Sequence, residues 1–156
     1  MSQQDMWSIE QSYFDKGVKI ICGVDEAGRG PLAGPVCAAA VILPPNVEIP
    51  GLNDSKKLSD KKRRELYPVI KEKAIAYTMV EVSEKIIDEI NILNATKLGM
   101  KQAIEKLVAE CALEGDFVVL TDGNMTLDIT LPQHSVVHGD ALSYSIGSAS
   151  IIAKVY

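Results

Sequence analysis

The chain has 156 residues, of which 47% are hydrophobic and 24% charged, and its net charge is −5. This composition predicts one globular domain and excludes both a disordered chain and a protein that grips nucleic acid with its whole surface. The longest apolar run, residues 36–43, is too short to cross a bilayer, and the polar start lacks the features of a signal peptide. We therefore expect a soluble, cytoplasmic protein that does not contact membranes.

Two short apolar runs bounded by glycine or proline, residues 18–24 and 36–43, predict two buried strands. The loop between them is rich in glycine and begins directly after two adjacent carboxylates, Asp25 and Glu26. Glycine loops commonly hold phosphate, so a cation is needed between such a ligand and the acidic pair. A dinucleotide fingerprint is disfavoured, because the spacing is GxGxxxG and prolines stand where a helix would begin.

Residues 56–73 are strongly basic, with eight Lys or Arg against three acidic residues and a net charge of +5. Ser59 is predicted to cap a helix that begins at Asp60, and Pro68 is predicted to break or restart this helix. A solvated helix face and a phosphate-binding surface both fit this charge pattern.

The middle of the chain predicts a third strand at residues 74–82, followed by two helices capped by Ser83 and Asn94. The second helix has an apolar stripe at helical spacing, which indicates core packing. The stripe consists of Met100, Ala103, Ile104, Leu107 and Cys111.

Residues 116–124 predict a strand that ends, like the first, in an acidic residue followed by glycine, at Asp122. Residues 134–139 predict a short fifth strand, and residues 143–155 predict a helix with one face of small side chains. The order β-β-α-β-α-α-β-β-α predicts an α/β fold, with a sheet flanked by helices.

The strands that end in Asp25–Glu26 and in Asp122 bring three carboxylates together if they are neighbours in the sheet. Unpaired carboxylates repel one another, so such a cluster predicts a hard divalent cation, Mg²⁺ or Mn²⁺. Two such ions would form the clamp used in phosphodiester cleavage. Taken alone, Asp122–Gly123 also fits an ordinary turn.

Four blocks, in order along nearly the whole chain, resemble ribonuclease HII, a type 2 ribonuclease H. They are GVDEAGRGPLAGPV (23–36), LNDSKKLSDKKRRELYP (52–68), TDGN (121–124) and GDALSYSIGSASIIAKV (139–155). The resemblance implies a single ribonuclease H-like catalytic domain over residues 1–156, with a mixed β-sheet flanked by helices. It also implies Mn²⁺- or Mg²⁺-dependent, two-metal-ion hydrolysis of the RNA strand of RNA–DNA hybrids. Nicking 5′ of ribonucleotides embedded in duplex DNA, to give 5′-phosphomonoester products in ribonucleotide excision repair, is implied as well.

The resemblance also implies roles for residues that match the family's motifs. Reading a 2′-hydroxyl is how a protein distinguishes RNA from DNA at one position. The implied catalytic and metal-binding carboxylates are Asp25, Glu26 and Asp122. The implied loop that contacts the nucleic-acid backbone and senses the 2′-hydroxyl consists of Gly28, Arg29 and Gly30. The resemblance also places Ser55, Lys56 and Lys57 on the nucleic-acid side, which makes the basic segment a phosphate-binding candidate.

Two departures from the family pattern affect the expected activity. Leu142 stands where a lysine is usual, and the chain stops at Tyr156. Family members typically continue into a helical portion that supplies a fourth catalytic carboxylate and a substrate-recognising tyrosine. We therefore expect a truncated monomer with weak or no activity, and self-association through apolar surface uncovered on the helix at 143–155. The alternatives are a hydrolase of the same fold that acts on another phosphodiester, and a non-catalytic module that binds RNA–DNA hybrids.

Overall fold

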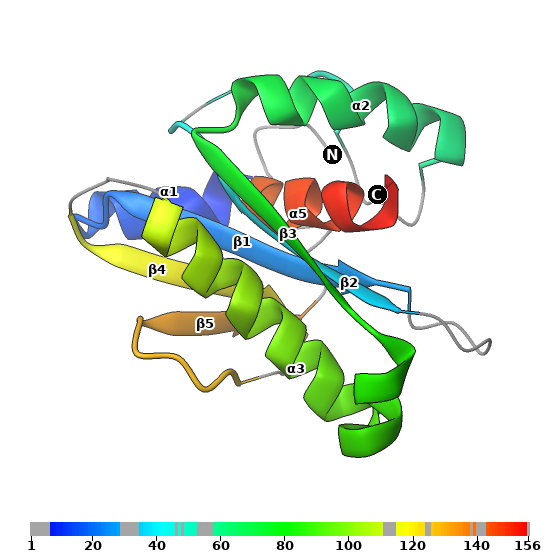
Figure 1. Ribbon diagram of the computed structural model, residues 1–156. Coiled ribbons are helices and arrows are strands. Elements are labelled where there is room, and N and C mark those ends of the chain that lie inside the picture. The colour runs from blue at the N-terminus through cyan, green and yellow to red at the C-terminus, as the bar shows by residue number, and fades with distance from the viewer. Residues whose placement is uncertain are drawn as a thin grey trace.

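A mixed five-stranded sheet with helices on both faces forms the framework of the molecule, which confirms the predicted α/β class (Figure 1). The elements are α1 (Ser8–Asp15), β1 (Ile20–Ala27), β2 (Val36–Ile42), α2 (Asp60–Lys73), β3 (Ala76–Val82), α3 (Glu84–Glu110), β4 (Phe117–Asp122), β5 (Gln133–Val136) and α5 (Tyr144–Val155). The computed structural model describes residues 7–28, 35–45, 47, 49–52, 58–110, 115–123, 126–137, 139 and 143–155.

The sheet has the strand order β3-β2-β1-β4-β5. β1 is antiparallel to β2 and β2 to β3, whereas β1 is parallel to β4 and β4 to β5. The two strands that the sequence predicts to end in carboxylates, β1 and β4, are therefore neighbours that run in the same direction. Their carboxyl ends meet at one edge of the sheet.

Side-chain alternation along β1 divides the core between the two faces of the sheet. Cys22 and Val24 pack with Met100, Ile104 and Leu107 of α3, which crosses one face. Each such fully buried aliphatic side chain stabilises the fold by roughly 1.5–3 kcal/mol. The opposite face carries α5 and α1, and these helices meet the alternate residues of β1 and β4.

A glycine in β1 allows α5 to cross the sheet in close contact. A Cβ atom at Gly23 would lie 2.1 Å from the carbonyl carbon of Ser145, so no larger residue fits unless the helix moves. The side chains from Ser143 to Ala153 are all buried. The expectation that this helix exposes apolar surface is therefore wrong for its described residues, because the sheet, α1 and α2 enclose it. Self-association stays a prediction.

The structure corrects the predicted break in α2. The helix runs without interruption from Asp60 to Lys73 and contains Pro68. Pro68 removes the N–H that would bond the Arg64 carbonyl, but both residues are exposed, so water can satisfy that carbonyl. Leu66 and Ile70 are buried on either side of the proline and hold the helix to the core.

The structure also corrects the cap of the second half of α3. Asn91, with φ 70°, interrupts the helix, and its Oδ1 accepts a hydrogen bond from the Asn94 N–H at 3.0 Å. Asn91 is therefore the cap, whereas the Asn94 side chain donates to the Ile90 carbonyl. Ser83 caps the first half as predicted, with its Oγ 3.4 Å from the Ile86 nitrogen. Four residues of the predicted stripe are buried, and Cys111 lies outside the described residues.

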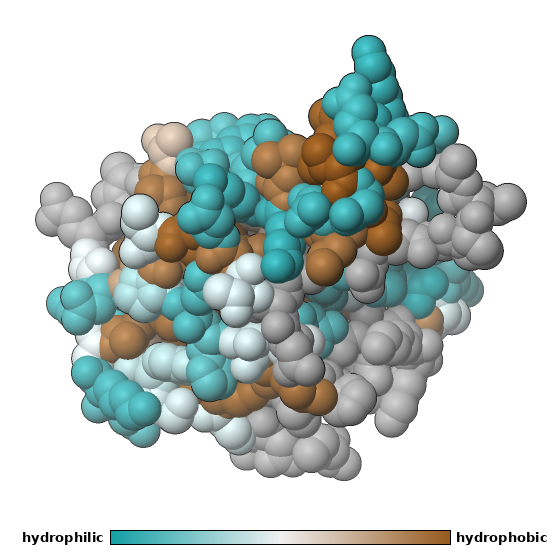
Figure 2. All heavy atoms as spheres, turned by 90° about the horizontal axis from the view of Figure 1, so that it is seen from below, coloured by the Kyte–Doolittle hydropathy of each residue, from teal (hydrophilic) through white to brown (hydrophobic). Residues whose placement is uncertain are grey.

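The sequence analysis did not predict α1. This helix begins after Trp7 without a side-chain cap and packs Ile9, Tyr13 and Phe14 against the core on the α5 side. These three apolar residues lie at helical spacing, but the helix has only eight residues. No helix in the described part of the chain is long and apolar enough to span a bilayer. The face shown in Figure 2 carries hydrophobic and hydrophilic residues side by side.

Candidate functional site

The predicted acidic residues lie where the parallel strands β1 and β4 end. Val24 pairs with Thr121, so Asp25 and Asp122 each follow at the next position of neighbouring strands. Asp25 shares its face of β1 with Gly23, which contacts α5, and Asp122 lies on the same face of β4 as Leu120. The structure therefore brings these two aspartates together on the α5 face.

Asp25 is a buried carboxyl in an acidic environment. It is only 5% exposed, and burial, followed by the charges of Glu26 and Asp122, raises its pKa from 3.8 to about 7. A hydrogen bond from the Glu26 N–H to Asp25 Oδ1, at 2.9 Å, and the charge of Lys154 act in the opposite direction. Burial and the two neighbouring carboxylates therefore disfavour the ionised form of Asp25 more than this amide and Lys154 favour it.

Glu26 follows Asp25 directly in β1, so strand alternation directs its side chain to the α3 face. The three predicted carboxylates therefore lie at the same edge of the sheet, but they do not share one face. Among the described residues, no group of three His, Cys, Asp or Glu side chains is arranged to hold a metal ion. The assignment of all three carboxylates to one metal site stays a prediction.

Asp122 is held by a backbone contact from the segment before α5. The Gly139 N–H donates to Asp122 Oδ1 at 2.8 Å. A Cβ atom at Gly139 would lie 2.6 Å from Cδ1 of Ile146 and 3.5 Å from Asp122 Oδ1, so the glycine backbone fits closely between helix and carboxylate. This contact fixes one oxygen of Asp122.

The glycine loop begins at Gly28, directly after β1. Gly28 has φ 94°, a conformation that favours glycine, and a Cβ atom there would lie 2.5 Å from the carbonyl oxygen of Pro35. The backbone at this position therefore requires glycine. Arg29 and Gly30 lie outside the described residues.

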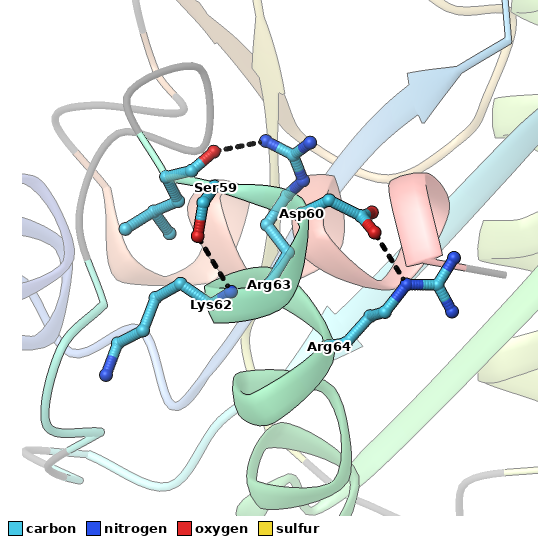
Figure 3. A network of polar contacts seen from close by, with 6 residues as sticks. Ser59, Asp60, Lys62, Arg63 and Arg64 are labelled. Carbon is cyan, nitrogen blue, oxygen red and sulfur yellow. Dashed lines mark hydrogen bonds and ion pairs between the residues drawn. The ribbon is translucent and has the colours of Figure 1, made fainter.

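The basic segment is described from residue 58 onward and forms α2 (Figure 3). Ser59 Oγ accepts from the Lys62 N–H at 3.0 Å, which confirms the predicted cap. Arg63 donates to the Leu58 carbonyl at 2.6 Å, and Arg64 pairs with Asp60 at 2.8 Å. Arg63 and Arg64 thus form contacts that stabilise the start of α2 itself.

The phosphate-binding role of this segment stays a prediction, because Ser55, Lys56 and Lys57 lie outside the described residues.

Three residues near the carboxylates were missed by the sequence analysis. Lys154 of α5 lies close enough to affect the pKa of Asp25, and its Nζ donates to Ser150 Oγ at 2.7 Å. Gly139 holds Asp122, and Glu10 binds the start of α5. The first two lie within the block 139–155, which could have drawn attention to them, whereas Glu10 lies in a polar stretch without any motif.

A cleft of about 500 Å³ lies on the α3 side of the molecule, between that helix and residues 128–131. Its lining includes Ile104, Val108 and Leu131, and an ion pair of 3.5 Å joins Lys101 and Asp128 at its border. None of the three predicted carboxylates lines this cleft. The cleft is therefore separate from the carboxylates at the strand ends.

Comparison with known sequences gives one consistent family. Residues 22–156 match the sequence model of the ribonuclease HII family. The chain is 51% identical over 152 residues to "Ribonuclease HII" of Caldicellulosiruptor saccharolyticus, covering 97% of this chain and 72% of that protein. It is 52% identical over 151 residues to "Ribonuclease HII" of Acetivibrio thermocellus, of which it spans 57%. The chain thus spans between about half and three quarters of the length of these relatives.

Solved structures agree in fold. The ribonuclease H2 of Pyrococcus horikoshii OT3 superposes with a TM-score of 0.73 at 26% identity, covering 87% of this chain and 71% of that one. Bst-RNase HIII, solved in complex with Mn²⁺, superposes with a TM-score of 0.75 at 22% identity, covering 89% and 52% of the two chains. These similarities confirm the ribonuclease H-like fold. The carboxylates at the strand ends agree with the family match and with these relatives. The chain therefore belongs to the ribonuclease HII family.

Proposed function

We propose that this chain is a metal-dependent endonuclease that hydrolyses the RNA strand of RNA–DNA hybrids and nicks 5′ of single ribonucleotides in duplex DNA. The observation that carries the proposal is the buried Asp25 beside Asp122 at the ends of two parallel strands, in a chain of the ribonuclease HII family. Enzymes of mixed α/β fold commonly place their reacting groups at such strand ends, where a rigid sheet supports them.

The donor set fits a hard divalent cation. Asp25, Glu26 and Asp122 offer carboxylate oxygens, which Mg²⁺ and Mn²⁺ prefer, and burial together with the charges of Glu26 and Asp122 raises the pKa of Asp25. We infer that Asp25 and Asp122 hold the metal from the α5 face, and that Glu26 joins them when the end of β1 turns to bring its carboxylate to that face. When bound, the metal supplies charge neutralisation and Lewis acidity at a phosphodiester. The protein keeps the donors in place through the Glu26 and Gly139 amides, which bind one oxygen of each aspartate.

Substrate recognition is assigned to residues on either side of the carboxylates. Gly28, Arg29 and Gly30 would contact the backbone around the ribonucleotide and sense its 2′-hydroxyl, since a loop without side chains admits the sugar edge closely. Ser55, Lys56 and Lys57 would bind phosphates together with the exposed basic residues of α2. Lys154, on the same face as Asp25, adds a positive charge beside the acidic pair.

The test uses a labelled DNA duplex that carries one ribonucleotide, with Mn²⁺ and with Mg²⁺. We expect one cut 5′ of the ribonucleotide, no cut in an all-DNA duplex and none in single-stranded RNA. Asp25→Asn should lower the rate at least about 100-fold, equivalent to a loss of about 3 kcal/mol of transition-state stabilisation. The same variant should bind Mn²⁺ more weakly by calorimetry in the absence of nucleic acid.

Other outcomes separate the alternatives. Tight binding of the hybrid without cleavage would establish a non-catalytic binding module. Cleavage of all three substrates would indicate a less selective phosphodiesterase. Unchanged Mn²⁺ affinity in Asp25→Asn, Glu26→Gln and Asp122→Asn would overturn the metal assignment.

Binding of the hybrid at several salt concentrations tests the basic segment. Replacement of both Lys56 and Lys57 by alanine should weaken binding and reduce the slope of log K against log salt, because each lost phosphate contact releases about one counterion fewer. An unchanged slope in the double variant would assign this segment to a solvated surface.

A further inference from the structure

We propose that Glu10 of α1 is a positioning residue for Asp122, and that it acts through the segment that leads into α5. The inference rests on the proposed function, because it takes Asp122 to be a metal ligand. Glu10 lies before the residues matched by the family model, which begin at residue 22. Three described parts of the molecule carry the argument: α1, the residues Gly139 and Ser143, and the end of β4.

Glu10 makes an unusually complete contact with the first turn of α5. Its side chain has an exposure of 0%. Its Oε2 accepts hydrogen bonds from Ser143 Oγ at 2.9 Å, from the Ser145 N–H at 2.9 Å and from Ser145 Oγ at 3.0 Å. A carboxylate at a helix N-terminus also interacts favourably with the helix dipole. One oxygen atom therefore fixes both serines at the point where α5 begins.

The same turn is connected to Asp122 by backbone hydrogen bonds. The Ser143 N–H donates to the Gly139 carbonyl at 2.8 Å. The Gly139 N–H in turn donates to Asp122 Oδ1 at 2.8 Å. A continuous series of hydrogen bonds thus runs from Glu10 through Ser143 and Gly139 to the carboxylate. The position of Gly139 is further limited by Ile146, whose Cδ1 leaves no space for a Cβ atom.

Docking of α1 does not by itself require a carboxylate. Ile9, Tyr13 and Phe14 already pack this helix against the core. Burial raises the pKa of Glu10, and its Oε1 is buried without a hydrogen-bond partner among the described residues. A buried carboxylate with one unsatisfied oxygen destabilises the fold relative to an apolar side chain. The feature that only Glu10 provides is the fixed orientation of Ser143 and Ser145.

The first experiment observes Gly139 directly, in the metal-free protein, by amide NMR and hydrogen exchange. Glu10→Ala removes the acceptor, and we expect a shifted Gly139 amide resonance and about tenfold faster exchange. Glu10→Gln keeps one acceptor oxygen and should give a smaller change in the same direction, which also serves if the alanine variant fails to fold. Phe14→Ala is the matched control, because it weakens the docking of α1 without touching the serines.

The second experiment measures Mn²⁺ alone by calorimetry and, separately, cleavage of the single-ribonucleotide duplex. Groups that orient a metal ligand typically contribute 10- to 100-fold to affinity or activity, so we expect Glu10→Ala to weaken Mn²⁺ binding about tenfold. It should also lower kcat with KM for the duplex unchanged, since α1 does not carry the phosphate-binding residues. Phe14→Ala should lower the thermal midpoint but change neither value more than about twofold.

A structural role alone gives a different pattern. An unchanged Gly139 amide in both Glu10 variants, or an equal change in Phe14→Ala at a similar loss of thermal midpoint, would overturn the inference. If the wild-type protein bound no Mn²⁺, the proposed function would fail instead. The Gly139 resonance would still decide whether Glu10 controls the contact to Asp122.

Discussion

Two buried carboxyl groups on the α5 face of the sheet, Glu10 and Asp25, have opposite surroundings. Glu10 is 0% exposed and receives hydrogen bonds from two hydroxyl groups and a helix N-terminal amide. Asp25 is 5% exposed, and its neighbours include Glu26 and Asp122, whose charges raise its pKa. Desolvation raises the pKa of both groups, but hydrogen bonds offset it at Glu10, whereas neighbouring charges add to it at Asp25.

The difference indicates which acidic site the protein completes by itself. At Glu10 the chain supplies donors for one oxygen, so the carboxylate can organise the start of α5 without a ligand. At Asp25 the chain supplies one amide and the more distant charge of Lys154 against two further carboxylates. Such an arrangement is stabilised by an added cation, which is why we assign metal binding to Asp25 and a positioning role to Glu10.

The largest expected effect is the pH-dependent stability of Asp25→Asn in the presence of a chelator. The folded-state pKa of Asp25, about 7, lies above its ordinary value of 3.8, so its protonated form favours folding. This stability is present below pH 4 and is lost as the pH rises through about 7, to a total of up to about 4 kcal/mol. Urea unfolding should therefore show the variant more stable than wild type at pH 8 and equally stable at pH 4.

Asn can still accept the hydrogen bond from the Glu26 N–H, so the variant isolates the charge. Glu10→Gln is the comparison, and it should gain less stability at pH 8, because loss of its hydrogen bonds with the serines offsets the benefit of removing a charge whose pKa burial also raises. A gain of the same size at both pH values would show that the charge of Asp25 does not strain the fold. Addition of Mn²⁺ should stabilise wild type more than Asp25→Asn, by about 3 kcal/mol at a hundred times Kd.

A smaller effect is expected where the two regions touch, at Gly23. A Cβ atom there would lie 2.1 Å from the Ser145 carbonyl carbon, so Gly23→Ala must displace α5 from β1. Overpacking of this kind costs typically 1–3 kcal/mol, and the displacement should also disturb the serines that bind Glu10. We expect a lower urea midpoint and a shifted Gly139 amide in the same variant. Gly23 does not have a positive φ, so the effect of this substitution reports the contact with α5 and no backbone strain.

A normal midpoint in Gly23→Ala would show that α5 can move away from the sheet without loss. A normal Gly139 amide with a lowered midpoint would separate packing of α5 from the position of Asp122.

The positions of Asp25 and Asp122 could be predicted, because the residues next to each of them form a recognisable pattern. Asp25 and Asp122 each follow a buried apolar run and precede a glycine within a few residues, so their places at strand ends could be read from the chain. Their shared face could not, because it depends on β1 and β4 being parallel neighbours with Val24 opposite Thr121. The divergence of Glu26 follows from β1 continuing to Ala27, beyond the predicted end of the strand.

The contact between Glu10 and α5 could not be predicted, because no pattern near Glu10 in the sequence indicates it. Glu10 lies in a short helix that the sequence analysis missed, and it contacts Ser145, 135 residues away in the chain. Likewise, two predicted helix boundaries were wrong. α2 continues through Pro68 because this position is exposed to solvent, and the second half of α3 is capped by Asn91, which has a positive φ, and not by Asn94. Short-range patterns specify strands and caps, whereas the residue that supports a site from a distant helix is known only once the helices are packed.

The smallest expected effect distinguishes two serines of the same helix, Ser145 and Ser148. Both are buried, but Ser145 Oγ donates to Glu10 at 3.0 Å, whereas Ser148 Oγ has no hydrogen-bond partner among the described residues. Loss of a hydrogen bond to a charged group costs about 1.5–3 kcal/mol, and loss of an unsatisfied buried hydroxyl costs little or stabilises. Ser145→Ala should therefore lower the free energy of unfolding by about 2 kcal/mol, a value at the lower part of that range because the Ser145 N–H still donates to Glu10. Ser148→Ala should leave the free energy of unfolding unchanged or raise it. Equal losses of the two variants in urea unfolding would show that the hydroxyl contact to Glu10 does not distinguish this end of α5 from the rest of the helix.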